Sequence, residues 1–148
     1  MNVLGNTDRT AHDDAVDWRG RRLLLVEDNE DHQYLTEAVL SATGVEVVIV
    51  DCGEDAIHAV TSSIAGDAAF DVVLMDIRLP TIDGYETTRR LRQLGYDRPI
   101  VALTARAMDA ELTQCHDAGC NACVSKPFDQ RLLRATIDDL LMPVTTGP

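Results

Sequence analysis

Short apolar segments alternate five times with segments of helical periodicity, and this alternation constrains the fold more than any other feature. The expected strands lie at residues 23–26, 45–50, 72–75, 100–103 and 122–124. Apart from Glu46, their residues form apolar runs rather than alternating with polar ones, which is typical of parallel strands covered on both faces. Crossovers between such strands are right-handed. The sequence therefore predicts an α/β protein with a three-layer, doubly wound (βα)5 fold and a five-stranded parallel sheet.

The segments between and after the expected strands carry apolar residues at helical spacing. We expect helices at residues 34–42, 56–64, 85–94, 107–118 and 132–141. The apolar face of the first helix consists of Tyr34, Leu35, Ala38, Val39 and Ala42. In the third helix, we expect Arg89, Arg90 and Arg92 to form a solvated face.

The length of 148 residues fits one domain of ordinary size. We expect a flexible leader at residues 1–20, a folded domain at 21–142 and a tail at 143–148. Trp18 is the one residue of the leader that could anchor it, and we expect its ring to lie partly exposed at the edge of the domain.

The net charge of −12 narrows the possible partners. Because phosphate groups repel an acidic protein, the sequence favours neither nucleic-acid binding nor an electrostatic hold on an anionic membrane. We expect no transmembrane helix, since no apolar run reaches about 18 residues. Acidic residues near the N-terminus do not suit an export signal, so we expect a cytoplasmic protein with reduced cysteines.

Polar residues lie where four of the expected strands end. Glu27 and Asp28 follow the first strand, and Asp76 follows the third. Thr104 and Lys126 lie after the fourth and fifth. Ligands of doubly wound folds bind at this edge of the sheet, so we expect these side chains to meet there. Crowded carboxylates favour a hard cation such as Mg²⁺, and an ammonium and a hydroxyl group could help to stabilise a phosphoryl group in transfer to an aspartate.

Each of these residues has an ordinary structural explanation when taken alone. Asp28 or Asn29 could cap the first helix, and Thr104 could cap the fourth. Lys126 could be a solvated side chain. A second group of residues has the sulfur and nitrogen ligands that zinc prefers: Cys115, His116, Cys120 and Cys123. The cysteines among them could equally be small buried thiols of the core. No histidine lies at a predicted strand end, and we assign none a catalytic role.

The sequence resembles the receiver domains of two-component response regulators over about residues 21–142. The matching stretches are LLLVEDNED at 23–31, DVVLMDIRLPTIDGYE at 71–86, PIVALTARAM at 99–108 and the run at 115–128 that ends in VSKPF. Their order, spacing and context all agree with the family. The resemblance implies a flavodoxin-like sheet with the strand order 2-1-3-4-5. It also implies a protein that catalyses its own phosphorylation and slow dephosphorylation, and not a metabolic enzyme.

The resemblance assigns a role to each residue at the strand ends. Asp76 would be the phosphoacceptor, Thr104 the switch hydroxyl, and Lys126 a bridge to a phosphoryl oxygen. The ligands of Mg²⁺ would be Glu27, mainly through water, Asp28, Asp76 and the backbone carbonyl of Arg78. The Lys126–Pro127 peptide bond would be cis.

The motifs are closest in style to receivers of hybrid sensor histidine kinases. This similarity implies a histidine kinase or a histidine phosphotransfer protein as the partner, and a receiver that is a monomer or a weak homodimer. Phosphorylation would switch the face formed by the fourth helix, fifth strand and fifth helix, or the phosphoryl group would be relayed onward. The sequence is compatible with a free-standing protein and with a domain of a hybrid kinase.

Cys123 departs from the family pattern, because many members carry Tyr or Phe three residues before the lysine. A small thiol cannot report the switch through ring burial, which puts the usual coupling between Thr104 and an aromatic ring in doubt. Arg78 and Arg106 lie two residues after Asp76 and Thr104, and they could tune how long the phosphoryl group survives.

Two other families with a site at this edge fit less well. A phosphatase of the haloacid dehalogenase type would also use Asp76, but it needs a second Asp where this chain has Arg78. A flavodoxin-like flavin protein needs a hydroxyl-rich loop after the first strand, where Glu27 and Asp28 would repel a phosphate.

Overall fold

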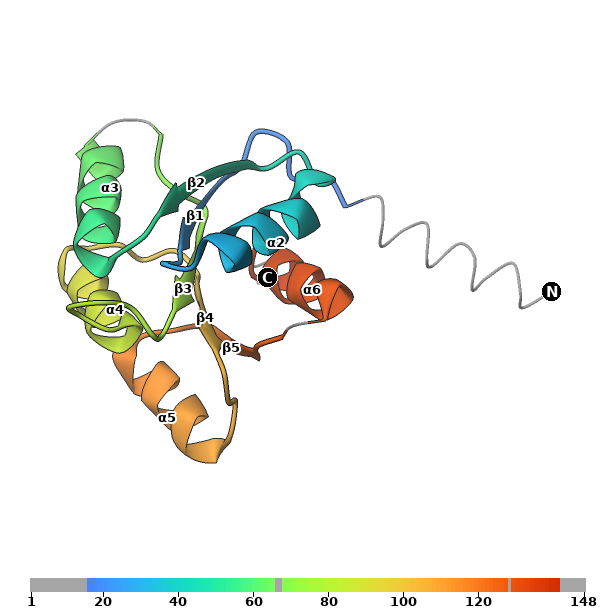
Figure 1. Cartoon of the computed structure of the whole chain (residues 1–148). Coiled ribbons are helices and arrows are strands. Elements are labelled where there is room, and N and C mark those ends of the chain that lie inside the picture. The colour runs from blue at the N-terminus through green and yellow to red at the C-terminus, as the bar shows by residue number, and fades with distance from the viewer. Residues whose placement is uncertain (1–15, 66–67, 128, 142–148) are drawn as a thin grey trace, which may run out of the picture.

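The computed structural model describes residues 16–65, 68–127 and 129–141, which form a sheet between two layers of helices (Figure 1). All strands are parallel: β1 (Arg22–Val26), β2 (Glu46–Val50), β3 (Val72–Asp76), β4 (Ile100–Thr104) and β5 (Ala122–Ser125). Their spatial order is β2-β1-β3-β4-β5. The predicted three-layer fold, its five strands and the strand order are confirmed.

The described residues form the helices α2 (Glu30–Ser41), α3 (Gly53–Ala65), α4 (Gly84–Gln93), α5 (Asp109–Ala118) and α6 (Gln130–Leu141). In Figure 1, α2 and α6 cover one side of the sheet, and α3, α4 and α5 cover the other. Within the described ranges, no helix is both long and apolar enough to cross a membrane.

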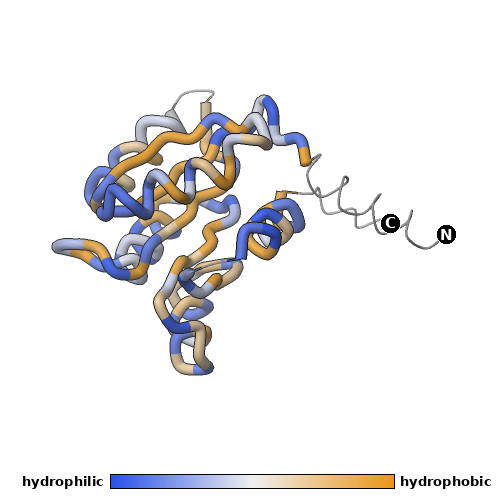
Figure 2. Tube along the Cα trace, turned by 45° about the vertical axis from the view of Figure 1, so that its right-hand side comes forward, coloured by the Kyte–Doolittle hydropathy of each residue, from blue (hydrophilic) through white to orange (hydrophobic). Residues whose placement is uncertain are grey.

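Each side of the sheet has its own hydrophobic core, because successive residues of a strand point to opposite faces. Leu23 and Leu25 of β1 belong to one core, and Leu24 and Val26 belong to the other. Figure 2 shows the hydrophobic strands enclosed by helices with hydrophilic outer turns.

The central strands β3 and β4 are buried along their whole length. Helices cover both of their faces, and each strand is paired on both edges. Their last residues, Asp76 and Thr104, are consequently only 6% and 7% exposed. The fold thus holds two polar side chains in a rigid apolar frame at the carboxyl edge of the sheet.

The buried face of α2 differs from the prediction. Tyr34 and Leu35 are 74% and 58% exposed, whereas Thr36, Val39 and Leu40 are buried. The segment offers two overlapping apolar stripes at helical spacing. The stripe with Leu40 packs on the sheet, because burial of Tyr34 on the other stripe would require a buried partner for its hydroxyl group.

The start of α2 also lies earlier than predicted. The side chain of Asn29 accepts a hydrogen bond from the backbone N of His32 at 3.0 Å and caps the helix. The interpretation of Asn29 as a cap is therefore confirmed, and the residue that follows it, Glu30, begins the helix.

Trp18 is buried, which corrects the expected partly exposed ring. Its side chain is 2% exposed and packs in the core between the sheet, α2 and α6. Its Nε1 donates a hydrogen bond to Oδ1 of Asp138 at 2.9 Å, and its backbone N donates to the carbonyl of Thr43 at 2.7 Å. Val16 and Trp18 therefore pack on the fold, and the rest of the predicted leader up to residue 15 lies outside the described residues.

Arg92 does not belong to a solvated face, although Arg89 and Arg90 are exposed and pair with Glu86. The guanidinium group of Arg92 donates to backbone carbonyls and one amide oxygen: those of Tyr96, Arg98 and Gly119, and Oδ1 of Asn121. It fastens α4 to the turn between α5 and β5. The prediction was wrong for Arg92 because its acceptors are backbone atoms, which no charge pattern reveals.

Candidate functional site

The carboxyl ends of β1, β3 and β5 bring two carboxylates and one ammonium group together. Glu27 directly follows β1, Asp76 ends β3, and Lys126 directly follows β5. The Nζ atom of Lys126 lies 2.6 Å from Oε1 of Glu27 and 3.4 Å from Oδ2 of Asp76. Parallel pairing aligns these strand ends, so residues that are far apart in the sequence share one site.

Asp28 completes a group of three carboxylates at this edge. Ligand oxygens of Glu27, Asp28 and Asp76 all lie within 4.8 Å of one another. Glu27 and Asp76 are buried, and Asp28 is exposed. Hard oxygen donors with one side open to water suit a partly hydrated Mg²⁺ ion.

Burial and mutual repulsion separate the pKa values of the two buried carboxylates. Loss of hydration and the neighbouring Glu27 raise the pKa of Asp76 to about 6, although the charge of Lys126 opposes the change. Burial also disfavours the charge of Glu27, but hydrogen bonds, first that from Lys126, outweigh it and lower the pKa of Glu27. In the metal-free protein, Glu27 therefore carries the charge that pairs with Lys126, and Asp76 is the more readily protonated partner.

Thr104 and Arg78 lie at the same edge and contact backbone or carboxylate groups. Oγ1 of Thr104 donates to the carbonyl of Arg106 at 3.2 Å and accepts from its backbone N at 3.3 Å. Because Met108 is the residue that caps α5, the alternative that Thr104 caps this helix is wrong. The backbone N of Arg78 donates to Oδ1 of Asp76 at 3.1 Å and orients the carboxylate.

The two loops beside Asp76 are closely packed. A Cβ atom on Gly84, the first residue of α4, would meet Cα of Ile77 at 2.7 Å, so only glycine fits without a shift of the backbone. The N–H of Gly84 donates to the carbonyl of Ile77 at 2.9 Å and closes the loop. In the other loop, the Lys126–Pro127 bond is cis, as the resemblance implied.

The sequence pattern of the response regulator receiver domain matches residues 23–138, which include all of the strand-end residues described above. This chain belongs to the response regulator receiver domain family. Membership over this length sets aside the phosphatase and flavin-protein alternatives.

The curated relatives of this receiver domain include large sensor kinases. It is 33% identical over 137 residues to the sensor histidine kinase RcsC of Salmonella typhimurium, an alignment that covers 91% of this chain and 13% of RcsC. It is 32% identical over 132 residues to the osmosensing histidine protein kinase SLN1 of Saccharomyces cerevisiae, which covers 88% of this chain and 11% of SLN1. The chain thus spans a small part of the length of these kinases.

Two solved receiver domains share the fold. One is the receiver domain of the sensor histidine kinase PA1611 from Pseudomonas aeruginosa, which has a magnesium ion coordinated in its active-site cleft. It is 36% identical with a TM-score of 0.73, and the match covers 82% of this chain and 98% of that one. The other is the receiver domain of the histidine kinase CKI1 from Arabidopsis thaliana, complexed with Mg²⁺ and BeF₃⁻. It is 30% identical with a TM-score of 0.73, and the match covers 82% of this chain and 90% of that one.

His32, to which the sequence pattern assigned no role, lies beside Lys126 in this receiver domain. Nδ1 of His32 lies 3.1 Å from Nζ of Lys126 and 3.6 Å from Oε2 of Glu27. His32 belongs to the first turn of α2, directly beyond the end of β1. Its position relative to that strand end was a usable signal, because the first turn after a strand borders the ligand edge in this fold.

Two of the four thiol groups, those of Cys115 and Cys120, are buried, and those of Cys52 and Cys123 are partly buried. Sγ of Cys123 lies 3.4 Å from Sγ of Cys115, and burial raises the pKa of Cys123 to about 12. Burial also raises the pKa of Cys120, to about 11. The side chain of His116 is 87% exposed. Among the residues that the structure describes, these four side chains do not gather their ligand atoms at one point.

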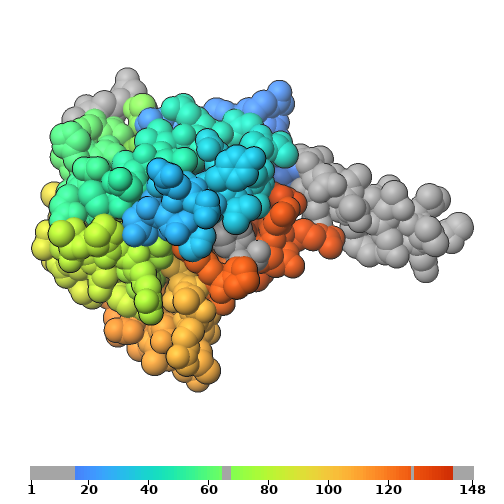
Figure 3. Space-filling model, in the orientation of Figure 1, coloured from blue at the N-terminus to red at the C-terminus, as the bar shows by residue number. Residues whose placement is uncertain are grey.

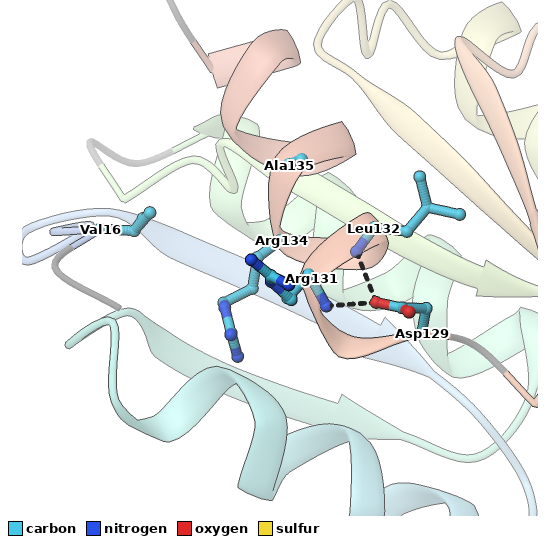
Figure 4. Close-up of a pocket in the computed structure, with 6 residues that line it drawn as sticks. All are labelled: Val16, Asp129, Arg131, Leu132, Arg134 and Ala135. Atoms are coloured by element: carbon cyan, nitrogen blue, oxygen red, sulfur yellow. Dashed lines mark hydrogen bonds between the residues drawn. The ribbon is translucent and has the colours of Figure 1, made fainter. Parts of the chain in front are cut away.

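Two hollows lie near α6. One of about 530 Å³ borders the candidate site and is lined by His32, Leu35, Thr36, Ala38, Val39, Ala105, Lys126, Pro127 and Gln130. Figure 3 shows the two helices that flank it, α2 in blue to cyan and α6 in red. The other, of about 400 Å³, contains none of the strand-end residues (Figure 4). There, Oδ1 of Asp129 accepts from the backbone N of Arg131 and Leu132 and caps α6.

Proposed function

We propose that this receiver domain takes a phosphoryl group from a phosphohistidine of a partner protein onto Asp76. The observation that carries the proposal is the position of the Lys126 ammonium group, 2.6 Å from Glu27 and 3.4 Å from Asp76. A positive charge beside a nucleophilic carboxylate can hold a phosphoryl oxygen as negative charge accumulates there. The family match over residues 23–138 supports the same assignment.

The donor set at this edge fits Mg²⁺ as the cofactor. Three carboxylates crowd within 4.8 Å, and burial, together with the neighbouring Glu27, raises the pKa of Asp76. A bound cation would favour the ionised form of these carboxylates. The ion would be held by Glu27, Asp28, Asp76 and the backbone carbonyl of Arg78. When bound, it would neutralise charge on the phosphoryl oxygens. The magnesium ions in the receiver domains of PA1611 and CKI1 support this assignment.

The residues of the chain account for the transfer step. Asp76 attacks phosphorus with one carboxylate oxygen while the bond from phosphorus to the donor imidazole breaks, and an acyl phosphate forms. The N–H of Arg78 holds Oδ1 of Asp76 at 3.1 Å, so the carboxylate is oriented before the donor arrives. Lys126 then bridges to a phosphoryl oxygen, and Thr104 exchanges the carbonyl of Arg106 for the phosphoryl group. Slow attack of water on phosphorus then breaks the acyl phosphate bond, which returns the aspartate and releases inorganic phosphate.

The partner follows from the relatives, many of which are histidine kinases that contain such a domain as a small part. We expect a histidine kinase or a histidine phosphotransfer protein to supply or receive the group. Phosphorylation would bias the face formed by α5, β5 and α6 between two states. The free thiols suit the reducing cytoplasm, and we expect a monomer or a weak homodimer.

The test is the intact mass of the protein after incubation with acetyl phosphate. We expect one phosphoryl adduct on the wild type with Mg²⁺, no adduct with a chelator, and no adduct on Asp76→Asn. An Asp139→Asn variant controls for the loss of one carboxylate, because Asp139 is exposed on α6. A folded wild type without an adduct would contradict the proposal, and an adduct on Asp76→Asn would move the acceptor elsewhere.

A further inference from the structure

The ammonium group of Lys126 has three protons, and three acceptors surround it. Nζ lies 2.6 Å from Oε1 of Glu27, 3.1 Å from Nδ1 of His32 and 3.4 Å from Oδ2 of Asp76. Lysine has no acceptor atom of its own, so the contacts with Glu27 and His32 use one N–H each. The third N–H is left for Asp76, which lies at ion-pair distance, or for a phosphoryl oxygen bound to it.

The contact with Lys126 defines which nitrogen of His32 carries the proton. Because an ammonium group can only donate, Nδ1 must offer its lone pair, and the proton of the neutral ring lies on Nε2. A neutral acceptor holds the ammonium group without cancelling its charge. Glu27, by contrast, holds the same group through an opposite charge.

The ring of His32 is not needed to build the helix that carries it. Its side chain is 47% exposed in the first turn of α2. The contact with the cap residue Asn29 is made by the backbone N of His32 and not by the ring. Replacement of the ring therefore leaves the cap in place, and its contact with Lys126 is what the replacement removes.

The ring also limits how Lys126 can move. The side chain of Lys126 is 17% exposed, and both residues line the hollow of about 530 Å³ between α2 and α6. If the ring of His32 were removed, water from this hollow would take its place beside Lys126. Water both donates and accepts and is not attached to the helix, so it would not hold the ammonium group in one orientation.

We propose that His32 is a positioning residue for phosphoryl transfer, which directs the ammonium group of Lys126 at Asp76 while leaving its charge intact. The inference rests on the proposed function, since it assigns a role within the same site. It predicts that an acceptor atom at the position of Nδ1 is required, and that an imidazole ring as such is not.

A matched pair of amides tests this requirement. Oδ1 of an asparagine is bonded to Cγ, as Nδ1 of a histidine is, whereas the oxygen of a glutamine lies one bond further out. We would measure the rate of adduct formation with acetyl phosphate and Mg²⁺ for His32→Ala, His32→Asn and His32→Gln. His58→Ala is the control, because His58 is an exposed histidine on α3.

We expect His32→Ala to slow adduct formation about five- to tenfold, the effect of losing one hydrogen bond of ordinary strength. His32→Asn should restore the rate to within about twofold of the wild type, while His32→Gln should stay slow and His58→Ala should match the wild type. Urea unfolding should give similar stability for all four variants. A long-range ¹H–¹⁵N spectrum of the wild type should show the proton of His32 on Nε2.

The outcomes separate this inference from the proposed function. An adduct on the wild type, together with an unchanged rate for His32→Ala or equal losses for the asparagine and glutamine variants, would overturn the positioning role alone. A proton on Nδ1 would overturn it as well. A wild type that takes no phosphoryl group would overturn the proposed function and this inference with it.

Discussion

Replacing Asp76 by asparagine should stabilise the metal-free protein. Burial, followed by the neighbouring Glu27, raises the pKa of Asp76 from its ordinary value of 3.8 to about 6. Each pKa unit corresponds to about 1.4 kcal/mol, so ionised Asp76 costs the folded state about 3 kcal/mol relative to the unfolded chain. The residue is only 6% exposed, so solvent screens little of this cost. Asparagine keeps an oxygen for the N–H of Arg78 and removes the charge.

The sign of the effect defines its pH window. A carboxyl group with a raised folded-state pKa binds its proton more tightly in the folded protein, so the cost is absent below pH 3.8 and complete above about pH 6. Asp76→Asn should therefore exceed the wild type in free energy of unfolding by about 2–3 kcal/mol at neutral pH and by only about 0.5 kcal/mol at pH 4.

Urea unfolding with a chelator, at several pH values between 4 and 7.5, measures this difference. Asp139→Asn provides the control, because it removes a carboxylate from an exposed position on α6. Addition of Mg²⁺ should narrow the difference, since the ion stabilises the form that binds it better. A stability gain that does not depend on pH, or no gain at neutral pH, would refute the electrostatic reasoning.

Other contacts in the structure lead to further expectations. Trp18→Phe should lower the free energy of unfolding by about 1 kcal/mol through loss of the hydrogen bond to Asp138, and Trp18→Ala by about 3–5 kcal/mol, both measured with urea. A phenylalanine variant as stable as the wild type would contradict a contribution from that bond. Gly84→Ala should cost about 1–3 kcal/mol, because its Cβ would strike the backbone of β3; an unchanged unfolding midpoint would disagree with the packing described. Arg78→Glu with Arg106→Glu should slow adduct formation with the anionic donor acetyl phosphate about fivefold at low salt and less at high salt. Equal dephosphorylation rates in that variant and the wild type would remove the hypothesis that these arginines tune the lifetime of the phosphoryl group.

The fold was predictable because its strongest signal is distributed over the whole chain. The apolar runs that became β3 and β4 are fully buried in the structure, and no helical periodicity competes with them. The α2 segment carried two competing apolar stripes, and the choice between Tyr34 and Leu40 depends on the neighbouring α6 and sheet rather than on the segment itself. Sequence periodicity identifies a helix more reliably than the face it buries.

Some residues of the site can be identified from the sequence and others cannot. The difference follows from the folding energy that a buried charge costs. Glu27 is fully buried beside an apolar strand, and Asp76 ends another. Charged groups in such places cost folding energy unless they are paired, so their presence at the ends of apolar runs is itself a signal of a shared site. His32 and Arg92 lie on helix surfaces, where polar residues are ordinary, so their residue types do not mark them, and only the position of His32 just after a strand end points to the site. The buried charge of Asp76 therefore explains two results at once. It makes the residue stand out at the end of an apolar run, and it is the charge whose removal in Asp76→Asn should stabilise the fold.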